Sequence, residues 1–372
     1  MTLSFTYYQD AITRLLHNHY PELGPLPFHS PDLQKWVWSL SETFRQQNKY
    51  ANGAYFKDRN MLAAYLTFIF PQSLYKIYAL LSELIPETPE PNPRESYHIL
   101  DIGTGLGASA LGAYELLRER FPDKPLNVDL VDINRHALSF LSELIQEQSH
   151  FHSVKWNIVQ SDIERFVLHA KKKWDCIILS LILSELRPRL TMVALIRKLL
   201  SLLNENGFLI IIEPASNEAS HNLIALRNKL INYDIFITAP CLNKLICPLT
   251  EMQNLWCYRE LRWQPPELMT FLNRKLYREI TTLKFSYLIL SNTRGFPASA
   301  GESASRLNLF RALSFPSHEK SKWVLKACDS NCTLRTLELR KKDITDDNRH
   351  FKKTCRGDLL HNIPDSLFHV LD

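Results

Sequence analysis

Glycine is scarce in this sequence. The 372 residues include 10 glycines, whereas average usage of about 7% would give roughly 26. Three of them, Gly103, Gly105 and Gly107, nevertheless fall within the stretch ILDIGTGLGAS. This concentration indicates a place where the backbone turns tightly or comes close to a ligand.

Long apolar runs are also absent. The longest, near 61–70 and 176–183, are too short to cross a bilayer. The opening residues, MTLSFTYYQDAITRLL, have neither a basic segment before an apolar one nor the Arg-rich, acid-poor pattern of a transit peptide. We therefore expect a cytoplasmic monomer with no membrane association.

No single sign of charge dominates the chain, whose net charge is +5, but the charge is unevenly placed. Residues 294–357 hold 14 Lys and Arg against 7 Asp and Glu, so this segment is more basic than the rest. A basic end favours a polyanionic partner, although a solvated charged face explains the charge equally well. The expected phosphate contacts are Lys341, Lys342, Lys352, Lys353 and Arg356.

Paired cysteines of the C-x2-C type are missing as well. The chain has 7 cysteines, an odd number, which is poor evidence for disulfides in a reducing compartment. Cys241, Cys247 and Cys257 follow the spacing C-x5-C-x9-C, and clustered cysteines in a loop are typical of metal ligands. Cys328 and Cys332 are candidates for a fourth ligand, whereas Cys355 in its basic run is expected to face solvent.

The pattern of apolar, polar and proline residues along the chain predicts three regions. Residues 1–95 predict helices and end in the Pro-rich linker 86–96. Within 96–292, short apolar strands alternate with helices, which is typical of a doubly wound α/β sheet, and a cysteine-bearing insertion occupies 240–282. Residues 293–372 form a basic, β-rich extension, in which KWVLKACDSNCTLR predicts a hairpin.

The glycine loop follows a predicted strand and opens a helix, the setting in which backbone N–H groups bind a ligand. The pattern Asp101-x-Gly103-x-Gly105-x-Gly107 resembles motif I of the seven-strand, Rossmann-like S-adenosylmethionine (SAM) methyltransferases. In this resemblance Asp132, at the end of the second strand, accepts hydrogen bonds from the ribose. Asp162, after the third strand, lies where such folds contact the adenine amine. Both could instead cap helices.

The methyl-acceptor half of the site is not recognisable. The stretch after the fourth strand, SLILSEL, lacks the Pro-Pro-aromatic motif of amino-directed nucleic-acid methyltransferases. Cys176 lies inside an apolar strand, where a small core residue is expected. Glu185 and Glu213 could line the pocket, but the catalytic residues are unknown.

The larger pattern resembles the mitochondrial and bacterial small-ribosomal-subunit methyltransferase-like family. It combines APC-x5-CPL, WCYRE, LKFSYLILSN, a hairpin with cysteine and a basic stretch ending in RGD, all after the motif I core. The resemblance, over roughly residues 40–358, implies a 4Fe–4S cluster on Cys241, Cys247, Cys257 and Cys328, and association with small-subunit rRNA. The residues alone leave zinc open.

Three functions compete. The first is a SAM-dependent rRNA methyltransferase, and the second is a SAM-binding small-subunit assembly or translation factor without catalysis. The third, a small-molecule methyltransferase, gives no purpose to a basic extension held by a metal. Fold analogy does not decide between the first two.

Overall fold

The computed structural model describes residues 3, 5–45, 58–87, 95–147, 151, 154–186, 191–278, 280–293, 309–346 and 348–360. The chain divides into two compact units, the first comprising Met1–Arg189 and Arg262–Thr281 and the second Leu190–Leu261 and Thr282–Asp372. Most of the predicted linker 86–96, and residues 294–308 of the basic segment, lie outside the described residues. The boundaries 1–95, 96–292 and 293–372 stay a prediction.

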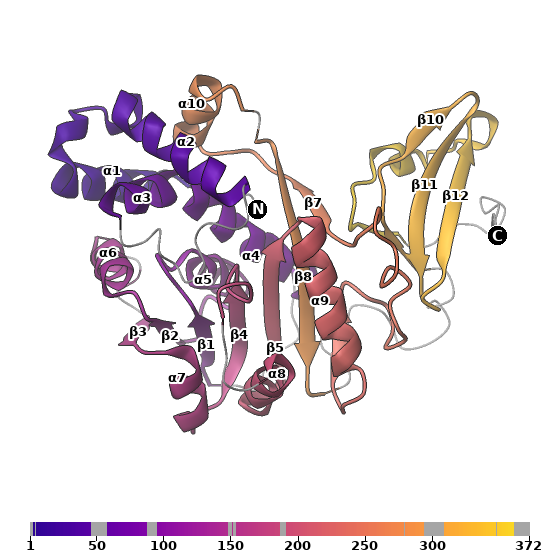
Figure 1. The fold of residues 1–372 in the computed structure, drawn as a ribbon, viewed down its shortest axis with the longest axis horizontal. Coiled ribbons are helices and arrows are strands. Elements are labelled where there is room, and N and C mark those ends of the chain that lie inside the picture. The colour runs from indigo at the N-terminus through magenta and orange to yellow at the C-terminus, as the bar shows by residue number, and fades with distance from the viewer. Residues whose placement is uncertain are drawn as a thin grey trace. The chain divides into compact units, whose positions relative to one another are not determined.

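The first unit contains four parallel strands in the order β3-β2-β1-β4 (Figure 1). The strands are β1 (Tyr97–Ile102), β2 (Leu126–Asp132), β3 (Lys155–Gln160) and β4 (Trp174–Ser180). Tyr97 lies opposite Leu126 and Ile99 opposite Cys176, so β1 is bonded on both sides. Because the strand order reverses between β1 and β4, a ligand is expected at the carboxyl ends of these strands.

Helices connect these strands and precede them. The connections are α5 (Ala108–Arg120), α6 (Arg135–Gln146) and α7 (Ile163–His169). The N-terminal region comprises α1 (Thr6–His19), η1 (Pro21–Leu23), η2 (Pro27–His29), α2 (Pro31–Arg45), α3 (Arg59–Ala64), the π-helical η4 (Tyr65–Ile69) and α4 (Phe70–Leu84). Individual residues explain where two of these helices begin. The Asn134 side chain caps α6 by accepting from Ala137 N–H, and Pro71 lies in the first turn of α4.

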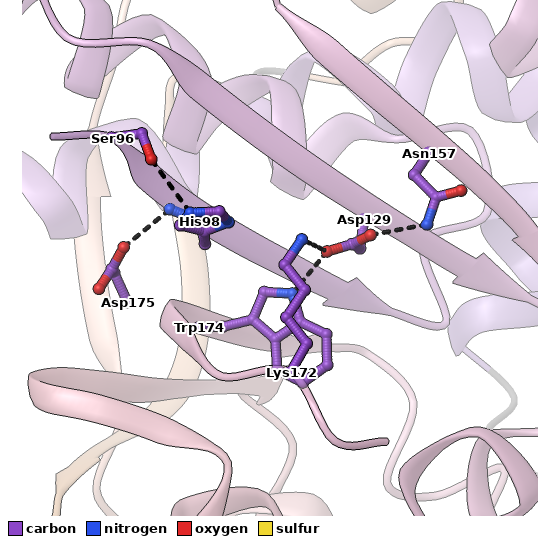
Figure 2. A network of polar contacts seen from close by, with 7 residues as sticks. All are labelled: Ser96, His98, Asp129, Asn157, Lys172, Trp174 and Asp175. Atoms are coloured by element: carbon purple, nitrogen blue, oxygen red, sulfur yellow. Dashed lines mark hydrogen bonds and ion pairs between the residues drawn. The ribbon is translucent and has the colours of Figure 1, made fainter. Parts of the chain in front are cut away.

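A polar network ties the strands of the first unit together (Figure 2). The buried carboxylate of Asp129 in β2 accepts hydrogen bonds from Asn157 at 2.7 Å, Lys172 at 2.7 Å and Trp174 at 2.6 Å. Burial alone would raise the pKa of Asp129, but these donors lower it below its usual value. The charge is thus satisfied inside the fold, and the network has a structural role.

The second unit begins with strands that pair antiparallel. Its order is β5-β8-β6, with β7 also beside β8, formed by β5 (Leu203–Pro214), β6 (Phe236–Ala239), β7 (Arg259–Arg262) and β8 (Thr282–Ser291). The helices α8 (Met192–Ser201) and α9 (Asn217–Leu230) flank β5 in the chain, whereas α10 (Glu267–Lys275), in the predicted insertion, belongs to the first unit. Ser216 caps α9 through Ala219 N–H.

A separate five-stranded sheet follows, in the order β10-β11-β9-β13 with β12 beside β11. Its elements are β9 (Phe310–Ala312), β10 (Ser317–Glu319), β11 (Lys322–Asp329), β12 (Leu334–Arg340), η7 (Lys341–Asp343), η8 (Arg349–Lys353) and β13 (Leu359–Leu360). The predicted hairpin is therefore β11–β12. The predicted α/β class, with a helical N-terminal region and a β-rich C-terminal extension, is confirmed. Within the described residues, every helix is too short or too polar to cross a membrane.

Candidate functional site

The glycine loop lies between β1 and α5 and requires glycine for steric reasons. Gly103, Gly105 and Gly107 have φ values of 69°, 53° and 80°, which L side chains rarely adopt. A Cβ at Gly103 would lie 1.8 Å from Ile182 Cδ1, and one at Gly107 would lie 2.4 Å from Leu141 Cδ1. Gly107 at the N-cap has no side chain to cap α5, so the loop leads directly into the N–H groups of a helix start.

The side chain of Asp101 is hydrogen-bonded to the glycine loop and to the first turn of α5. Its buried carboxylate accepts hydrogen bonds from Thr104 Oγ1 at 2.8 Å and from Ala110 N–H at 3.1 Å. Burial raises the pKa of Asp101 to about 7, although these two hydrogen bonds oppose the shift. The loop therefore rests on a carboxyl group that titrates near neutral pH.

Asp132 lies at the carboxyl end of β2, where the sequence predicts the ribose contact. Its oxygens accept hydrogen bonds from Gly105 N–H at 2.8 Å and Asn134 N–H at 2.7 Å. Burial raises its pKa above the usual value. The structure therefore brings Asp101, Asp132 and the three glycines together at one edge of the parallel strands.

Asp162 differs from the others. It is exposed and caps α7, accepting a hydrogen bond from Arg165 N–H at 3.0 Å. The capping alternative from the sequence is thus what the structure contains, and an adenine contact stays a prediction.

Tyr65 is a residue of this site that the sequence did not indicate. It lies in the π-helix η4, an irregularity frequent at functional sites. Burial raises the pKa of Tyr65, and the carboxylates of Glu185, Asp101 and Asp132 add to the rise. No periodicity in MLAAYLTFIF marks a π-helix, so no local pattern of the sequence points to Tyr65.

The candidate residues for the methyl-acceptor half of the site lie in different parts of the structure. Glu185 follows β4 in a turn whose first residue, Leu181, has a φ of 59°, and backbone strain of this kind clusters at functional sites. Glu213 is buried in β5 of the second unit. Cys176 is buried in β4, and burial raises the pKa of its thiol, consistent with a core residue.

Five cysteines line one cavity in the second unit. Its lining includes Cys241, Cys247, Cys257, Cys328 and Cys332. The first three come from the segment between β6 and β7, and the last two from the β11–β12 hairpin. The structure thus brings all the predicted ligands to one place across 71 chain positions between Cys257 and Cys328.

The thiols of Cys241, Cys247 and Cys257 are protonated near neutral pH. Burial, first of all, raises the pKa of Cys247 to about 11 and that of Cys257 to about 12, and neighbouring cysteines add to both shifts. Burial also raises the pKa of Cys241. Metal binding here would therefore release protons.

Cys328 lies in β11, and Cys332 lies in the turn that follows it. The interaction between the two thiols raises the pKa of Cys328 and lowers that of Cys332. Cys332 adopts a φ of 58°, and its Sγ lies 3.0 Å from Asn243 Oδ1. Both side chains reach the cavity, so the choice of fourth ligand remains open between them.

The lining of this cavity offers thiols, which as thiolates are the usual ligands of iron–sulfur clusters and also bind zinc. Within the described ranges, no three His, Cys, Asp or Glu side chains converge closely enough to hold a metal ion. Buried Nε atoms of Arg227 and Arg356 make no hydrogen bond within the described structure, and they suit an anionic group.

The structure also shows which of the residues expected at the protein surface are exposed. Cys355 is buried, so the expectation that it faces solvent is wrong: η8 and β13 fold over it. Lys341, Lys342, Lys352 and Lys353 are exposed. Arg356 is half-buried instead, donating to Trp256 O at 2.7 Å and lying 3.8 Å from the Tyr258 ring centre.

Fold and loop together define the chain as an α/β protein with a methyltransferase-type glycine loop. Residues 59–361 match the family described as mitochondrial small ribosomal subunit Rsm22. The chain belongs to this family, as the resemblance in its sequence implied.

The curated relatives are longer proteins. The Rsm22-cox11 tandem proteins 1 and 2, mitochondrial, of Schizosaccharomyces pombe are each 21% identical over 368 residues, covering 88% of this chain and 48% of theirs. The chain thus spans about half the length of these relatives.

Solved structures resemble the chain only loosely. An rRNA methylase from Streptococcus thermophilus is 16% identical with a TM-score of 0.32, covering 59% of this chain and 95% of its own. The plantazolicin methyltransferase BamL, solved with SAH, is 13% identical with a TM-score of 0.35, covering 77% and 100%. No functional conclusion rests on similarities of this size.

Proposed function

We propose that the chain is a SAM-binding, methyltransferase-like protein that acts on or binds the rRNA of the small ribosomal subunit and carries a 4Fe–4S cluster. The observation that carries the proposal is the glycine loop, built on Asp101 and bonded to Asp132, in a chain of the Rsm22 family. The family description supports the ribosomal partner. The names of the relatives support the same assignment.

The SAM-binding half of the proposed site lies at the carboxyl ends of β1 and β2. Gly103, Gly105 and Gly107 let the backbone approach the methionine part of SAM, and Asp132 accepts hydrogen bonds from the ribose. With the ribose at β2, the ligand extends across the switch point toward the end of β4. Tyr65 and Glu185 stand near that end, where the methyl group would be presented.

The cysteine half holds the cluster. Cys241, Cys247 and Cys257 bind it together with Cys328, and zinc is the alternative metal for the same thiolates. The cluster supplies a cross-link between the 241–257 segment and the β11–β12 hairpin, which fixes the basic extension in place. Structural metal sites contribute on the order of 10 kcal/mol to folding.

Two versions of this function differ in chemistry. The ordered donor loop supports an enzyme, whereas the absence of an acceptor motif in SLILSEL supports a non-catalytic assembly or translation factor. A small-molecule methyltransferase is the least supported version, because the basic extension would then have no partner. No residue is assigned a catalytic role.

Methyl transfer from labelled SAM to purified small subunits separates these versions. An enzyme places one specific methyl group on the small-subunit rRNA, and Gly105→Arg, which fills the loop, abolishes it. A factor transfers no label while still binding SAM in calorimetry. Binding of NAD in place of SAM by the unaltered chain would refute the donor assignment.

The remaining expectations are a monomeric state and a cytoplasmic location in a bacterial-type host. The curated relatives carry mitochondrial names. Gel filtration and fractionation of the native host test these two expectations directly.

A further inference from the structure

Three arginines hold the cysteine-bearing segments around the cavity. Arg227 in α9 donates to Asn243 O at 2.9 Å and to Leu245 O. Arg311 in β9 donates to Pro240 O at 2.9 Å and to Gly357 O at 2.8 Å. Arg356 donates to Trp256 O at 2.7 Å. Each arginine therefore fixes a carbonyl beside, or between, the candidate ligands.

The charges of these arginines have no carboxylate partner. Arg227 is 2% exposed and Arg311 8% exposed. Throughout the described ranges, neither these two nor Arg356 forms an ion pair with Asp or Glu. Other arginines of the unit do, such as Arg335 with Asp329 at 2.8 Å. The carbonyl oxygens that accept from these guanidinium groups carry no formal charge, so an anionic group in the cavity would be stabilised by them.

The cysteines face these charges. Arg227 and Arg311 line the cavity together with Cys241 and Cys257, and the charges of both arginines oppose the rise in the pKa of Cys241. Arg356 acts on Cys257 as well. The positive charge is thus directed at the thiols themselves as well as at the loops that carry them.

We propose that Arg227, Arg311 and Arg356 are charge-compensating positioning residues of the cysteine site, which stabilise its bound cluster in the reduced, more negative state. This inference rests on the proposed cluster. One-electron reduction adds one negative charge to the cluster, and three nearby guanidinium groups favour that added charge. Burial, hydrogen bonding and nearby charge are the means by which proteins set cluster potentials.

The test is a potentiometric titration of the anaerobically purified full-length chain, with dithionite as the electron donor and electron paramagnetic resonance as the readout. Arg227→Met removes a charge, and Arg227→Lys keeps the charge without the two-pronged donor. We expect Arg227→Met to make the reduction equilibrium at least tenfold less favourable, which is about 59 mV for one electron. Arg227→Lys should recover most of that change. Arg349→Met, at an exposed arginine paired with Asp346, is the matched control and should change nothing.

The outcomes separate the two claims. A wild-type chain without iron, or with zinc, refutes the cluster and the redox inference with it. Iron in the wild type with an unchanged potential in Arg227→Met refutes the inference alone. If Arg227→Met loses its iron, Arg356→Met, at a less buried site, replaces it, and an unchanged potential there likewise overturns the inference. A loop-clamping role without electrostatics would make the Lys and Met variants lose iron equally and leave the potential of the remaining clusters unaltered.

Discussion

At Gly103, glycine is required for two separable reasons, the backbone angle and the space. With φ at 69°, an L side chain costs on the order of 1–2 kcal/mol, and the contact with Ile182 adds to this. Gly103→Ala should therefore weaken SAM binding at least tenfold and lower the free energy of unfolding. Calorimetry and urea denaturation measure both effects.

Ile182 supplies the control for that prediction. The double variant Gly103→Ala/Ile182→Ala removes the clash but keeps the unfavourable φ, so it should recover part of the lost affinity. No recovery would mean that the backbone angle alone explains the effect. Full wild-type binding by Gly103→Ala would contradict the loop's role.

The raised pKa of Asp101 predicts how the free energy of unfolding changes with pH. Its folded-state pKa of about 7 lies above the usual value, so between about pH 4 and 7 the folded chain holds a proton that the unfolded chain has lost. Its contribution to stability is fully present below about pH 4 and is lost as the pH rises through 7. In Asp101→Asn this loss should disappear. Urea denaturation at pH 5 and pH 8 measures it, and equal pH slopes in both proteins would contradict the assignment.

At the scale of elements, the cysteine site depends on two segments being joined. Anaerobic wild-type chain should hold about four irons, and Ser at Cys241, Cys247 or Cys257 should release them and reduce solubility. Cys176→Ala, in the core of β4, is the control that should keep its iron. Iron analysis of Cys328→Ser and Cys332→Ser then identifies the fourth ligand. Retention of iron in every variant would rule out the cysteine site.

The repeating elements of the α/β region could be predicted from the sequence. The segments YHILDIG, NVDLVDI and KWNIVQSD become β1, β2 and β3, because their apolar runs and intervening helices are local signals. The helix expected from Ala108 begins there, after a glycine whose conformation ends the turn. Asp132 and the three glycines could be predicted to lie at this edge for the same reason, since a strand end and a glycine loop are both visible in a short window; their role in binding SAM stays a prediction.

Features that depend on distant pairing could not be predicted. Arg311 in β9 lies opposite Leu359 in β13, a pairing that no local pattern encodes. The burial of Cys355 and the contact of Arg356 with Tyr258 follow from that same folding back. Base stacking needs an exposed aromatic ring, and the sequence alone does not show that Trp263 is buried, with its indole N–H donating to Ile280 O at 2.9 Å. Trp323 is partly buried, with Lys352 Nζ 4.3 Å from its ring centre, so it remains a candidate.

At the scale of the whole molecule, binding to RNA should depend on salt through the exposed lysines. Each phosphate contact contributes about −0.7 to the log–log slope on single strands. Replacing Lys341, Lys342 and Lys353 by Ala should therefore flatten the slope by about 2 units if all three touch phosphate. Removing the same charge from the exposed Lys155, Lys171 and Lys173 of the first unit is the control. An equal flattening by the control set would show that the extension is not the binding surface.

Whether the chain is a SAM-binding partner of the small ribosomal subunit can be measured by cosedimentation of the anaerobically purified chain with purified small subunits over a salt series. We expect the chain to sediment with the subunit at low salt and to be released steeply as salt rises. Gly105→Arg, which loses SAM, should still bind if the chain is a factor whose RNA surface is separate from the donor loop. Absence of binding, or binding that does not change with salt, would contradict the proposed function and leave a small-molecule methyltransferase as the better explanation.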